Sequence, residues 1–512
     1  MKRLGVSILC IVALLSSVSA EYWWGGAVGL GYNQPYINQS AFDMHVEDAN
    51  NQLVPLFLSS DGRYRWSDSA VVFSAQEGQL YTPGMEEVQA GTTLREAYMA
   101  AQQRYFPSTG KLPDTLFFTM PQYNTWIELM YNQNQEDILR YAHAIIDNGF
   151  PAGVLMIDDN WQRYYGNFDF KSERFPDAKA MVDELHALGF RVMLWVCPFV
   201  SADSPESRQL AEKGFLLRTP DNGTAILHWW NGYSACYDLT NPAAADYFVE
   251  QLRGVQERYG IDGFKFDAGD NNCYASTPIV SYDNNASTTD HTTSYAKIGL
   301  SFPFNEYRAC WKMGGQPLVQ RLGDKDYSWS AVQSLIPSMC VAGMLGYAYA
   351  CPDMIGGGQW TSFLGIGSDE FDQTLIVRST QVHALMPMMQ FSVAPWRILS
   401  EENLRIVRDM AQLHTQFAPY IMEYAHRAAQ TGEPIVRCME YQFPHQGFAQ
   451  CNDQFMLGDK YLVAPMVSEG TERMVQLPKG LWRDEQGKRY RGGKSYKIDV
   501  PLSRLPYFAK IR

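Results

Sequence analysis

The chain has 512 residues, of which 46% are hydrophobic and 13% aromatic, and its formal net charge is −13. This composition excludes a disordered protein, because it supplies ample apolar area for large packed cores, and the length favours two to four domains. A nucleic-acid partner would require a stripe of basic residues to neutralise phosphates. No such stripe is present, so nucleic-acid binding is disfavoured.

The N-terminus has the pattern of a secretory signal. Lys2 and Arg3 precede an apolar run over residues 4–15, and the small residues 18–20 form a cleavage site. The run is too short to cross a bilayer as a permanent helix, and no second stretch of about 18 apolar residues follows. The sequence therefore predicts a signal peptide over residues 1–20, export to the periplasm or the medium, and no membrane insertion.

Residues 21–111 have the pattern of an antiparallel β domain. Short alternating runs such as 52–58 and 70–73 are interrupted by turns rich in Asn, Asp and Gly. One stretch, residues 93–104, has helical spacing instead. We therefore expect an N-terminal β-sandwich with a single helix.

Residues 112–424 alternate between strand and helix patterns. Strands are expected at residues 115–120, 153–157, 191–196, around 264, 317–320, 344–350 and 385–391, and helices at 135–147, 178–188 and 243–259. This α/β alternation over about 300 residues is typical of a (β/α)₈ TIM barrel. A doubly wound open sheet is the alternative, but no glycine-rich phosphate loop follows the first strand.

Residues 425–512 return to β patterns. Strands are expected at 434–439, 454–457, 460–464 and 474–477, which predicts a C-terminal β domain. Eight cysteines follow the predicted signal, and an exported protein can form disulfides. Cys438 and Cys451 flank a predicted hairpin and are therefore the expected pair.

Carboxylates recur where the predicted barrel strands end. Asp158 and Asp159 follow one strand, Asp267 follows another, and Asp324 and Asp353 lie after later ones. Any one of them could be a structural turn residue, but in a barrel these strand ends converge on one face. Burying several carboxylates together is costly unless they are paired or functional. The pattern therefore favours an active site there.

Three kinds of chemistry could use such acids. Two carboxylates that face one pocket are the minimum requirement for glycoside hydrolysis. A metal site is disfavoured because no His-x-x-x-His motif or histidine cluster accompanies the acids, and a serine hydrolase is disfavoured because no Gly-x-Ser-x-Gly motif is present. We therefore expect a carbohydrate partner, no metal and no other cofactor.

Several motifs resemble glycoside hydrolase family 31, the retaining α-glycosidases. Residues 264–270 (Phe-Lys-Phe-Asp-Ala-Gly-Asp) resemble the family's nucleophile motif, which places Asp267 as nucleophile. Residues 323–329 (Gly-Asp-Lys-Asp-Tyr-Ser-Trp) resemble its acid/base motif, which places Asp324 as acid/base, although Lys325 replaces Asn. Asp326 is a weaker rival for the acid role.

Further segments support the resemblance in order and spacing. They are residues 174–177, 194–195, 352–357, 454–459 and 462–465, together with Arg378 and Gln381, which resemble an Arg-Trp-x-Gln helix with Ser379 in place of Trp. The resemblance implies a two-step reaction through a covalent glycosyl-enzyme. Asp267 would attack, Asp324 would act first as acid and then as base, and the two carboxyl groups would lie roughly 5–5.5 Å apart.

The sugar preference rests on residues near the second predicted barrel strand. The run Asp158-Asp159-Asn160-Trp161 is similar to the Asp-Asp-x-Trp run of separate α-galactosidase families. Two acceptors beside an aromatic wall suit sugar hydroxyls O4 and O6 held on one side, as an axial O4 requires. The alternative is that Asp159 only caps the following loop.

Other positions bear on the same question. The histidine that α-glucosidase members carry is absent from residues 387–392. Lys265 and Arg308 resemble the cationic contacts of the α-galactosidase and myogenesis-regulating-glycosidase-like branch. Trp195 belongs to a strand signature of the family, and Trp230 is a candidate stacking wall, although Trp229 and Trp230 could equally be core residues.

These observations predict an exo-acting α-galactosidase-like hydrolase. An α-glucosidase or α-xylosidase of the same family is the alternative. A non-catalytic carbohydrate-binding protein on the same fold is disfavoured, because both candidate catalytic acids are present.

Overall fold

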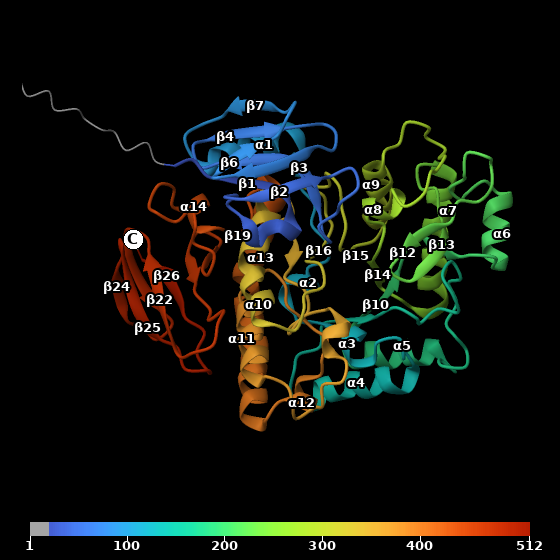
Figure 1. The fold of residues 1–512 in the computed structure, drawn as a ribbon. Helices are drawn as coiled ribbons and strands as arrows, with labels where there is room; N and C mark the ends of the chain where they lie inside the picture. Colours follow the sequence, from blue (N-terminus) through green and yellow to red (C-terminus); the bar gives the residue numbers. More distant parts are fainter. Residues whose placement is uncertain (1–19, 512) are drawn as a thin grey trace, which may run out of the picture.

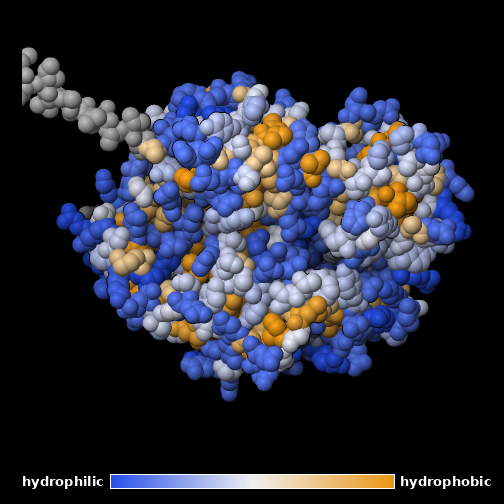
Figure 2. Space-filling model, viewed as in Figure 1, coloured by the Kyte–Doolittle hydropathy of each residue, from blue (hydrophilic) through white to orange (hydrophobic). Residues whose placement is uncertain are grey.

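The computed structural model describes residues 20–511 (Figure 1). The predicted signal peptide lies almost wholly outside these residues. Within the described part of the chain, no helix has both the length and the apolar character needed to cross a bilayer. The surface seen in Figure 2 is mostly hydrophilic, with small scattered apolar patches.

A parallel eight-stranded sheet forms the centre of the molecule and confirms the predicted α/β barrel. Its strands, in spatial order, are β17 (Ala350–Cys351), β16 (Gln320–Arg321), β15 (Phe304–Tyr307), β14 (Gly263–Phe266), β10 (Arg191–Val196), β9 (Val154–Ile157), β8 (Gln122–Asn124) and β18 (Gln390–Phe391). A parallel bridge between Met354 and Gln390 brings the two ends together. β9 and most of β10 are buried on both faces, which explains their continuous apolar runs.

Helices cover the outside of this sheet. The long ones are α4 (Gln135–Asp147), α5 (Ala178–Ala187), α7 (Pro242–Tyr259), α9 (Thr288–Ile298), α10 (Trp329–Met344), α11 (Gln373–Ala384) and α13 (Glu401–Thr431). Short helices are α2 (Leu116–Thr119), α3 (Trp126–Leu129), α8 (Asn271–Tyr274) and α12 (Pro395–Ile398), with 3₁₀ turns η2 (Gly299–Ser301) and η3 (Trp360–Phe363). The predicted helices at 135–147, 178–188 and 243–259 are confirmed to within one residue at each end.

The strand predicted at residues 115–120 is wrong. This segment forms the short helix α2, and the first barrel strand is β8, which begins after Pro121. Phe117 and Phe118 are fully buried, and α2 packs against α13. A short apolar run satisfies a buried helix as well as a buried strand, so its composition could not distinguish the two.

Later barrel strands are shorter than predicted. The segments 317–320, 344–350 and 385–391 contribute only two-residue strands near their C-terminal ends. β15 was missed because its residues Asn305 and Glu306 break the apolar pattern of a buried strand. Both side chains are nevertheless 1% exposed, because they hydrogen-bond inside the protein.

The N-terminal part forms two antiparallel sheets, as predicted. One contains β1 (Trp23–Ala27), β3 (Leu53–Ser59), β4 (Arg63–Trp66) and β7 (Glu86–Gln89), and the other contains β2 (Gln39–Asp43), β5 (Val72–Gln76) and β6 (Gln79–Tyr81). The predicted helix is α1 (Leu94–Tyr105), and a 3₁₀ turn, η1 (Val28–Asn33), packs against α10 of the barrel.

A small antiparallel sheet is inserted between β10 and α7. It contains β11 (Phe199–Ser201), β13 (Gly232–Cys236) and β12 (Leu227–Trp229), with helix α6 (Pro205–Glu212) beside it. The turn between β12 and β13 carries Trp230 and Asn231. Sequence patterns did not predict this insertion.

The C-terminal part is a β domain, as predicted. One sheet contains β19 (Val436–Arg437), β20 (Phe455–Leu457), β21 (Tyr461–Val463), β26 (Tyr507–Lys510), β23 (Leu481–Asp484) and β24 (Arg489–Arg491). A second pair contains β22 (Glu472–Leu477) and β25 (Lys494–Asp499), and α14 (Met439–Gln442) follows β19.

The expected disulfide between Cys438 and Cys451 is wrong, because both are free thiols. Cys438 is buried with its sulfur 4.0 Å from that of Met344, whereas Cys451 lies beside the carboxyl group of Asp453. Spacing in the sequence could not show that the two side chains contact different groups.

Arg378 and Gln381 join the barrel to the C-terminal domain. Arg378 is fully buried on α11, and its Nη2 donates to the carbonyl of Val500 at 2.7 Å. Gln381 Nε2 donates to the carbonyl of Leu502 at 2.7 Å, and its Oε1 accepts from Arg378 at 2.9 Å. These family-like residues therefore hold the domain junction and lie outside the active site.

Replacing Arg378 should weaken this junction. We expect Arg378→Met to lower the free energy of unfolding by about 2–3 kcal/mol, because it leaves buried carbonyls without donors. Denaturant-induced unfolding measures the change. Arg208→Met is the control, because the Arg208–Asp203 ion pair is exposed and should contribute at most about 0.5 kcal/mol. Equal losses in the two variants would contradict the role of Arg378.

Candidate active site

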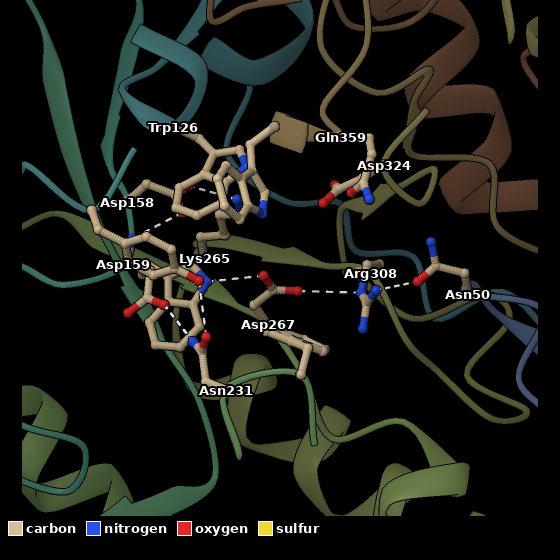
Figure 3. Close-up of a pocket in the computed structure, with 14 residues that line it drawn as sticks. Asn50, Trp126, Asp158, Asp159, Asn231, Lys265, Asp267, Arg308, Asp324 and Gln359 are labelled. Carbon is tan, nitrogen blue, oxygen red and sulfur yellow. Dashed lines mark hydrogen bonds and ion pairs between the residues drawn. The ribbon is translucent and has the colours of Figure 1, made fainter. Parts of the chain in front are cut away.

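A cavity of about 580 Å³ opens at the carboxyl ends of the barrel strands (Figure 3). All predicted site residues except Trp161 line it. Residues that sequence reasoning did not identify also line it, and they are Asn50, Trp126, Tyr131, Asn231, Gln359 and Trp360. The cavity therefore combines barrel strand ends with the inserted hairpin and with a loop of the N-terminal domain.

Asp267 occupies the position directly after β14. Its carboxylate accepts a hydrogen bond from Trp195 Nε1 at 2.9 Å and forms an ion pair with Arg308 at 3.3 Å. The next two residues, Ala268 and Gly269, have φ values of 59° and 75°, which turn the chain sharply away from the strand. This turn leaves the carboxylate at the strand end, facing the cavity.

The charges around Asp267 keep it ionised. Burial raises its pKa, but the positive charges of Arg308, Lys265 and Arg321 outweigh burial and lower the pKa to about 2. At neutral pH the side chain is therefore a carboxylate, the form required for a nucleophile.

Asp324 lies three residues beyond Arg321, the last residue of β16. Arg321 Nη1 contacts Asp324 Oδ1 at 2.8 Å, and the Asp324 side chain is 27% exposed whereas that of Arg321 is 1% exposed. A Cβ atom at Gly358 would lie 3.0 Å from Asp324 Oδ1 and 2.8 Å from Asp353 Oδ1, so a side chain there would push against both carboxyl groups. Asp324 is thus held from behind by a buried cation and open to the cavity in front.

Arg321 is the centre of a buried network that the sequence did not reveal. It also contacts Glu306 at 3.2 Å and Asp353 at 2.9 Å. Asp353 in turn accepts backbone hydrogen bonds from Lys325 at 2.8 Å and Gly358 at 3.0 Å. The position of Asp353 at a strand end identified it as a candidate site residue. Its carboxyl group is fully buried, and it supports Asp324 indirectly, because both contact Arg321.

Another ion pair, Lys265–Asp158, forms the floor of the cavity. Lys265 Nζ lies 2.6 Å from Asp158 Oδ2, and both side chains are at most 4% exposed. Burial lowers the pKa of Lys265, but the charges of Asp158, Asp267 and Glu306 produce a net rise, so the ammonium stays charged. A positive and a negative side chain, Lys265 and Asp158, therefore both face the cavity.

Asp159 is held by neutral partners instead. Its carboxyl group accepts hydrogen bonds from Tyr165 Oη at 3.0 Å and from Asn231 Nδ2 at 3.0 Å. Burial and the adjacent charge of Asp158 raise its pKa to about 7. Asn231 belongs to the inserted hairpin, so this insertion determines the surroundings of Asp159.

The tryptophans have distinct locations. Trp195 is 1% exposed and contacts Asp267, whereas Trp230 is 48% exposed and stacks on Arg308 with 4.6 Å from the guanidinium carbon to the ring centre. Trp229 is 3% exposed and packs on Phe199 as a core residue. The structure thus separates Trp230, which faces the cavity, from Trp229.

The prediction that Trp161 contacts substrate is wrong. Its indole is fully buried, donates a hydrogen bond to the carbonyl of Trp195 at 2.7 Å and packs against Phe170. The Asp-Asp-x-Trp run could not show which way the loop after β9 turns. Trp161 therefore supports the strand that carries Trp195.

The sequence also offered Asp326 as a rival acid and a metal site as an alternative use of the carboxylates. Asp326, the rival acid, is exposed and does not line the cavity. Among the described residues, 20–511, no group of three or more His, Cys, Asp or Glu side chains is arranged to hold a metal ion.

Comparison with known proteins agrees with this geometry. Residues 119–424 match the glycosyl hydrolases family 31 TIM-barrel domain, and residues 432–511 match the glycosyl hydrolase family 31 C-terminal domain. The chain therefore belongs to glycosyl hydrolase family 31, a family of carbohydrate-active enzymes.

Individual relatives have related names. The chain is 33% identical over 458 residues to the myogenesis-regulating glycosidase of Mus musculus, covering 87% of this chain and 63% of that protein. It is 26% identical over 506 residues to alpha-xylosidase XylQ of Lactiplantibacillus pentosus, covering 92% of this chain and 62% of that protein. The chain thus spans less than two thirds of the length of these curated relatives.

Solved structures share the fold. A dextranase of Flavobacterium johnsoniae complexed with glucose superposes with a TM-score of 0.81 at 19% identity, covering 96% of this chain and 65% of that chain. An alpha-xylosidase from a soil metagenome complexed with xylose gives a TM-score of 0.80 at 22% identity, covering 96% and 78%.

The raised pKa of Asp159 predicts that the difference in stability between wild type and Asp159→Asn depends on pH. Because its folded pKa of about 7 exceeds the ordinary aspartate value of 3.8, its contribution to stability is full below pH 3.8 and is lost as the pH rises towards about 7. Asp159→Asn stays neutral, so its free energy of unfolding relative to wild type should increase between pH 4 and pH 7 and level off above. Unfolding by denaturant across this range measures it, and a constant difference would contradict the assignment.

Proposed function

We propose that the protein is a retaining, exo-acting α-glycoside hydrolase that releases α-linked galactose from oligosaccharides or glycans. The observation that carries the proposal is the pair Asp267 and Asp324. Both face one cavity, and each is held by its own buried arginine. The ionised Asp267 suits the nucleophile, and the more exposed Asp324 suits an acid that must exchange its proton with leaving group and water.

The reaction then has two balanced steps. The Asp267 carboxylate forms a bond to the anomeric carbon while the glycosidic C–O bond breaks, and Asp324 gives its proton to the departing oxygen. In the second step water attacks the anomeric carbon, Asp324 takes the proton of that water, and the bond to Asp267 breaks. Trp195 and Arg308, which bind the Asp267 carboxylate, fix its direction of attack.

Release of a terminal sugar is supported by the charged floor of the cavity. Lys265 and Asp158 provide a donor and an acceptor for hydroxyls far from the anomeric carbon, and Asp159 adds a second acid beside them. The free hydroxyls at the end of a sugar chain can hydrogen-bond to the charged groups of this floor. This supports exo-action over cleavage inside a chain.

Galactose is supported by the tandem acids Asp158 and Asp159, which both line the cavity. At residues 387–392, where α-glucosidase members carry a histidine, Gln390 is buried in the barrel and hydrogen-bonds Glu306 at 2.8 Å. The alternative, glucose or xylose, is supported by similarity to alpha-glucosidase 2 of Bacillus thermoamyloliquefaciens and to XylQ. We also propose export after cleavage near Ala20, on the basis of the N-terminal pattern.

A panel of aryl α-glycosides tests the sugar preference. We expect the highest kcat/KM on the galactoside, because two adjacent acids can accept from an axial O4 and from O6. The glucoside, xyloside and N-acetylgalactosaminide are the comparison substrates. A clear preference for the glucoside or xyloside would replace galactose with that sugar and leave the hydrolase assignment intact.

Variants of the two carboxylates test the mechanism. Asp267→Ala should lower kcat by at least about 10³-fold because the nucleophile is lost. Asp324→Ala should retain much more activity on substrates whose leaving groups depart without protonation. Asp326→Ala is the matched control for Asp324 and should have wild-type rates. Wild-type activity of Asp267→Ala on any aryl glycoside, or of Asp324→Ala on a glycoside whose leaving group needs protonation, would refute the pair.

A further inference from the structure

A loop of the N-terminal domain, residues 43–52, reaches the cavity from outside the barrel. Asn50 lines the cavity, and its side-chain oxygen accepts a hydrogen bond from Arg308 Nη1 (Figure 3). Gln52 is fully buried, and its Nε2 donates to the backbone carbonyls of Arg308 at 2.8 Å and Arg321 at 3.1 Å. The two arginines that hold the candidate catalytic carboxylates are therefore both tied to this one loop.

The loop is anchored closely against the barrel. The carbonyl oxygen of Asn50 lies only 2.2 Å from where a Cβ at Gly323 would be, so a side chain beside Asp324 is excluded. Asn271 Nδ2 donates to the carbonyls of Met44 at 2.7 Å and Glu47 at 3.1 Å. These contacts fix the loop against Asn271, which follows the Asp267 turn, and against Gly323, which precedes Asp324.

Asn50 also has a backbone conformation that suits its role. Its φ is 57°, in the left-handed region that asparagine and glycine tolerate better than most residues. Unusual backbone conformations persist where the surrounding structure holds them, and they are concentrated at functional sites. Here the conformation directs the side-chain oxygen towards Arg308.

Asn50 is one of four groups that surround the guanidinium of Arg308, together with Asp267, Asp270 and the Trp230 ring. Arg308 contacts Asp267 through Nε and Asp270 through Nη2, while Nη1 contacts Asn50. The guanidinium is a planar fork, so fixing Nη1 fixes the direction of Nε. Without Asn50, Asp270 and the Trp230 ring would remain as the other contacts of the fork, and Nη1 would lose the acceptor that holds Nε towards Asp267.

We propose that Asn50 and Gln52 are positioning residues for the reaction. Asn50 sets the guanidinium of Arg308 against Asp267, and Gln52 holds the two backbones that carry Arg308 and Arg321. The inference rests on the proposed function, because it takes Asp267 and Asp324 as the reacting pair. The family domains matched at 119–424 and 432–511 do not include the loop.

The test compares Asn50→Gly, Asn50→Asp and wild type on whichever aryl α-glycoside wild type hydrolyses fastest. Glycine accepts the backbone conformation but lacks the acceptor, so kcat should fall about 10- to 100-fold, as expected for loss of a hydrogen bond to a charged group. KM should change little. Asn50→Asp keeps an oxygen acceptor and should recover a large part of the lost kcat.

The matched control is Asn222→Gly. Asn222 also has a positive φ, 71°, and accepts from an arginine, Arg218 Nη1, at 2.6 Å, but it lies in an exposed turn. It should keep the wild-type kcat. Gln52→Met provides a second variant, which removes both donors to the arginine carbonyls and should also lower kcat.

The outcomes separate this inference from the proposed function. If Asp267→Ala is inactive while Asn50→Gly has the wild-type kcat, the inference fails alone. It also fails if Asn222→Gly loses as much activity as Asn50→Gly, or if Asn50→Asp gives no recovery. If Asp267→Ala retains wild-type activity, the proposed function itself fails.

Discussion

The structure of the site depends on burying cations together with carboxylates. An isolated carboxylate loses several kcal/mol when it leaves water, and several at one strand end would also repel one another. Lys265, Arg308 and Arg321 remove this cost, and each contacts a different acid of the cavity wall. The same pairing that makes the site stable also keeps Asp267 ionised and fixes Asp324.

The parts of the chain outside the barrel have unequal roles at this site. The inserted hairpin provides Asn231 and Trp230, which contact Asp159 and Arg308. The N-terminal loop contacts Arg308 directly through Asn50. The C-terminal domain accepts a hydrogen bond from Arg378 of α11, which does not line the cavity. The first two segments therefore shape the cavity, while the third supports the barrel.

Several errors of sequence reasoning share one cause. The segment 115–120, Trp161 and the cysteine pair were all interpreted from local pattern, yet each outcome depends on which distant group the segment packs against. Helix α2 packs against α13, Trp161 turns towards Trp195, and Cys438 faces Met344. Likewise, Arg321 and Glu306 could not be identified, because a charged residue within a strand gives no signal of its partner.

The sequence by itself determined the alternation of strands and helices, the order of the domains and the acids at the strand ends, because these follow from local periodicity and from short motifs. Only the tertiary structure decided which cation holds which acid, that Trp230 faces the cavity while Trp161 does not, and that Asn50 reaches Arg308. Those contacts join residues that are up to 258 positions apart. Their geometry is set by how the barrel and the N-terminal domain pack, which local pattern does not encode.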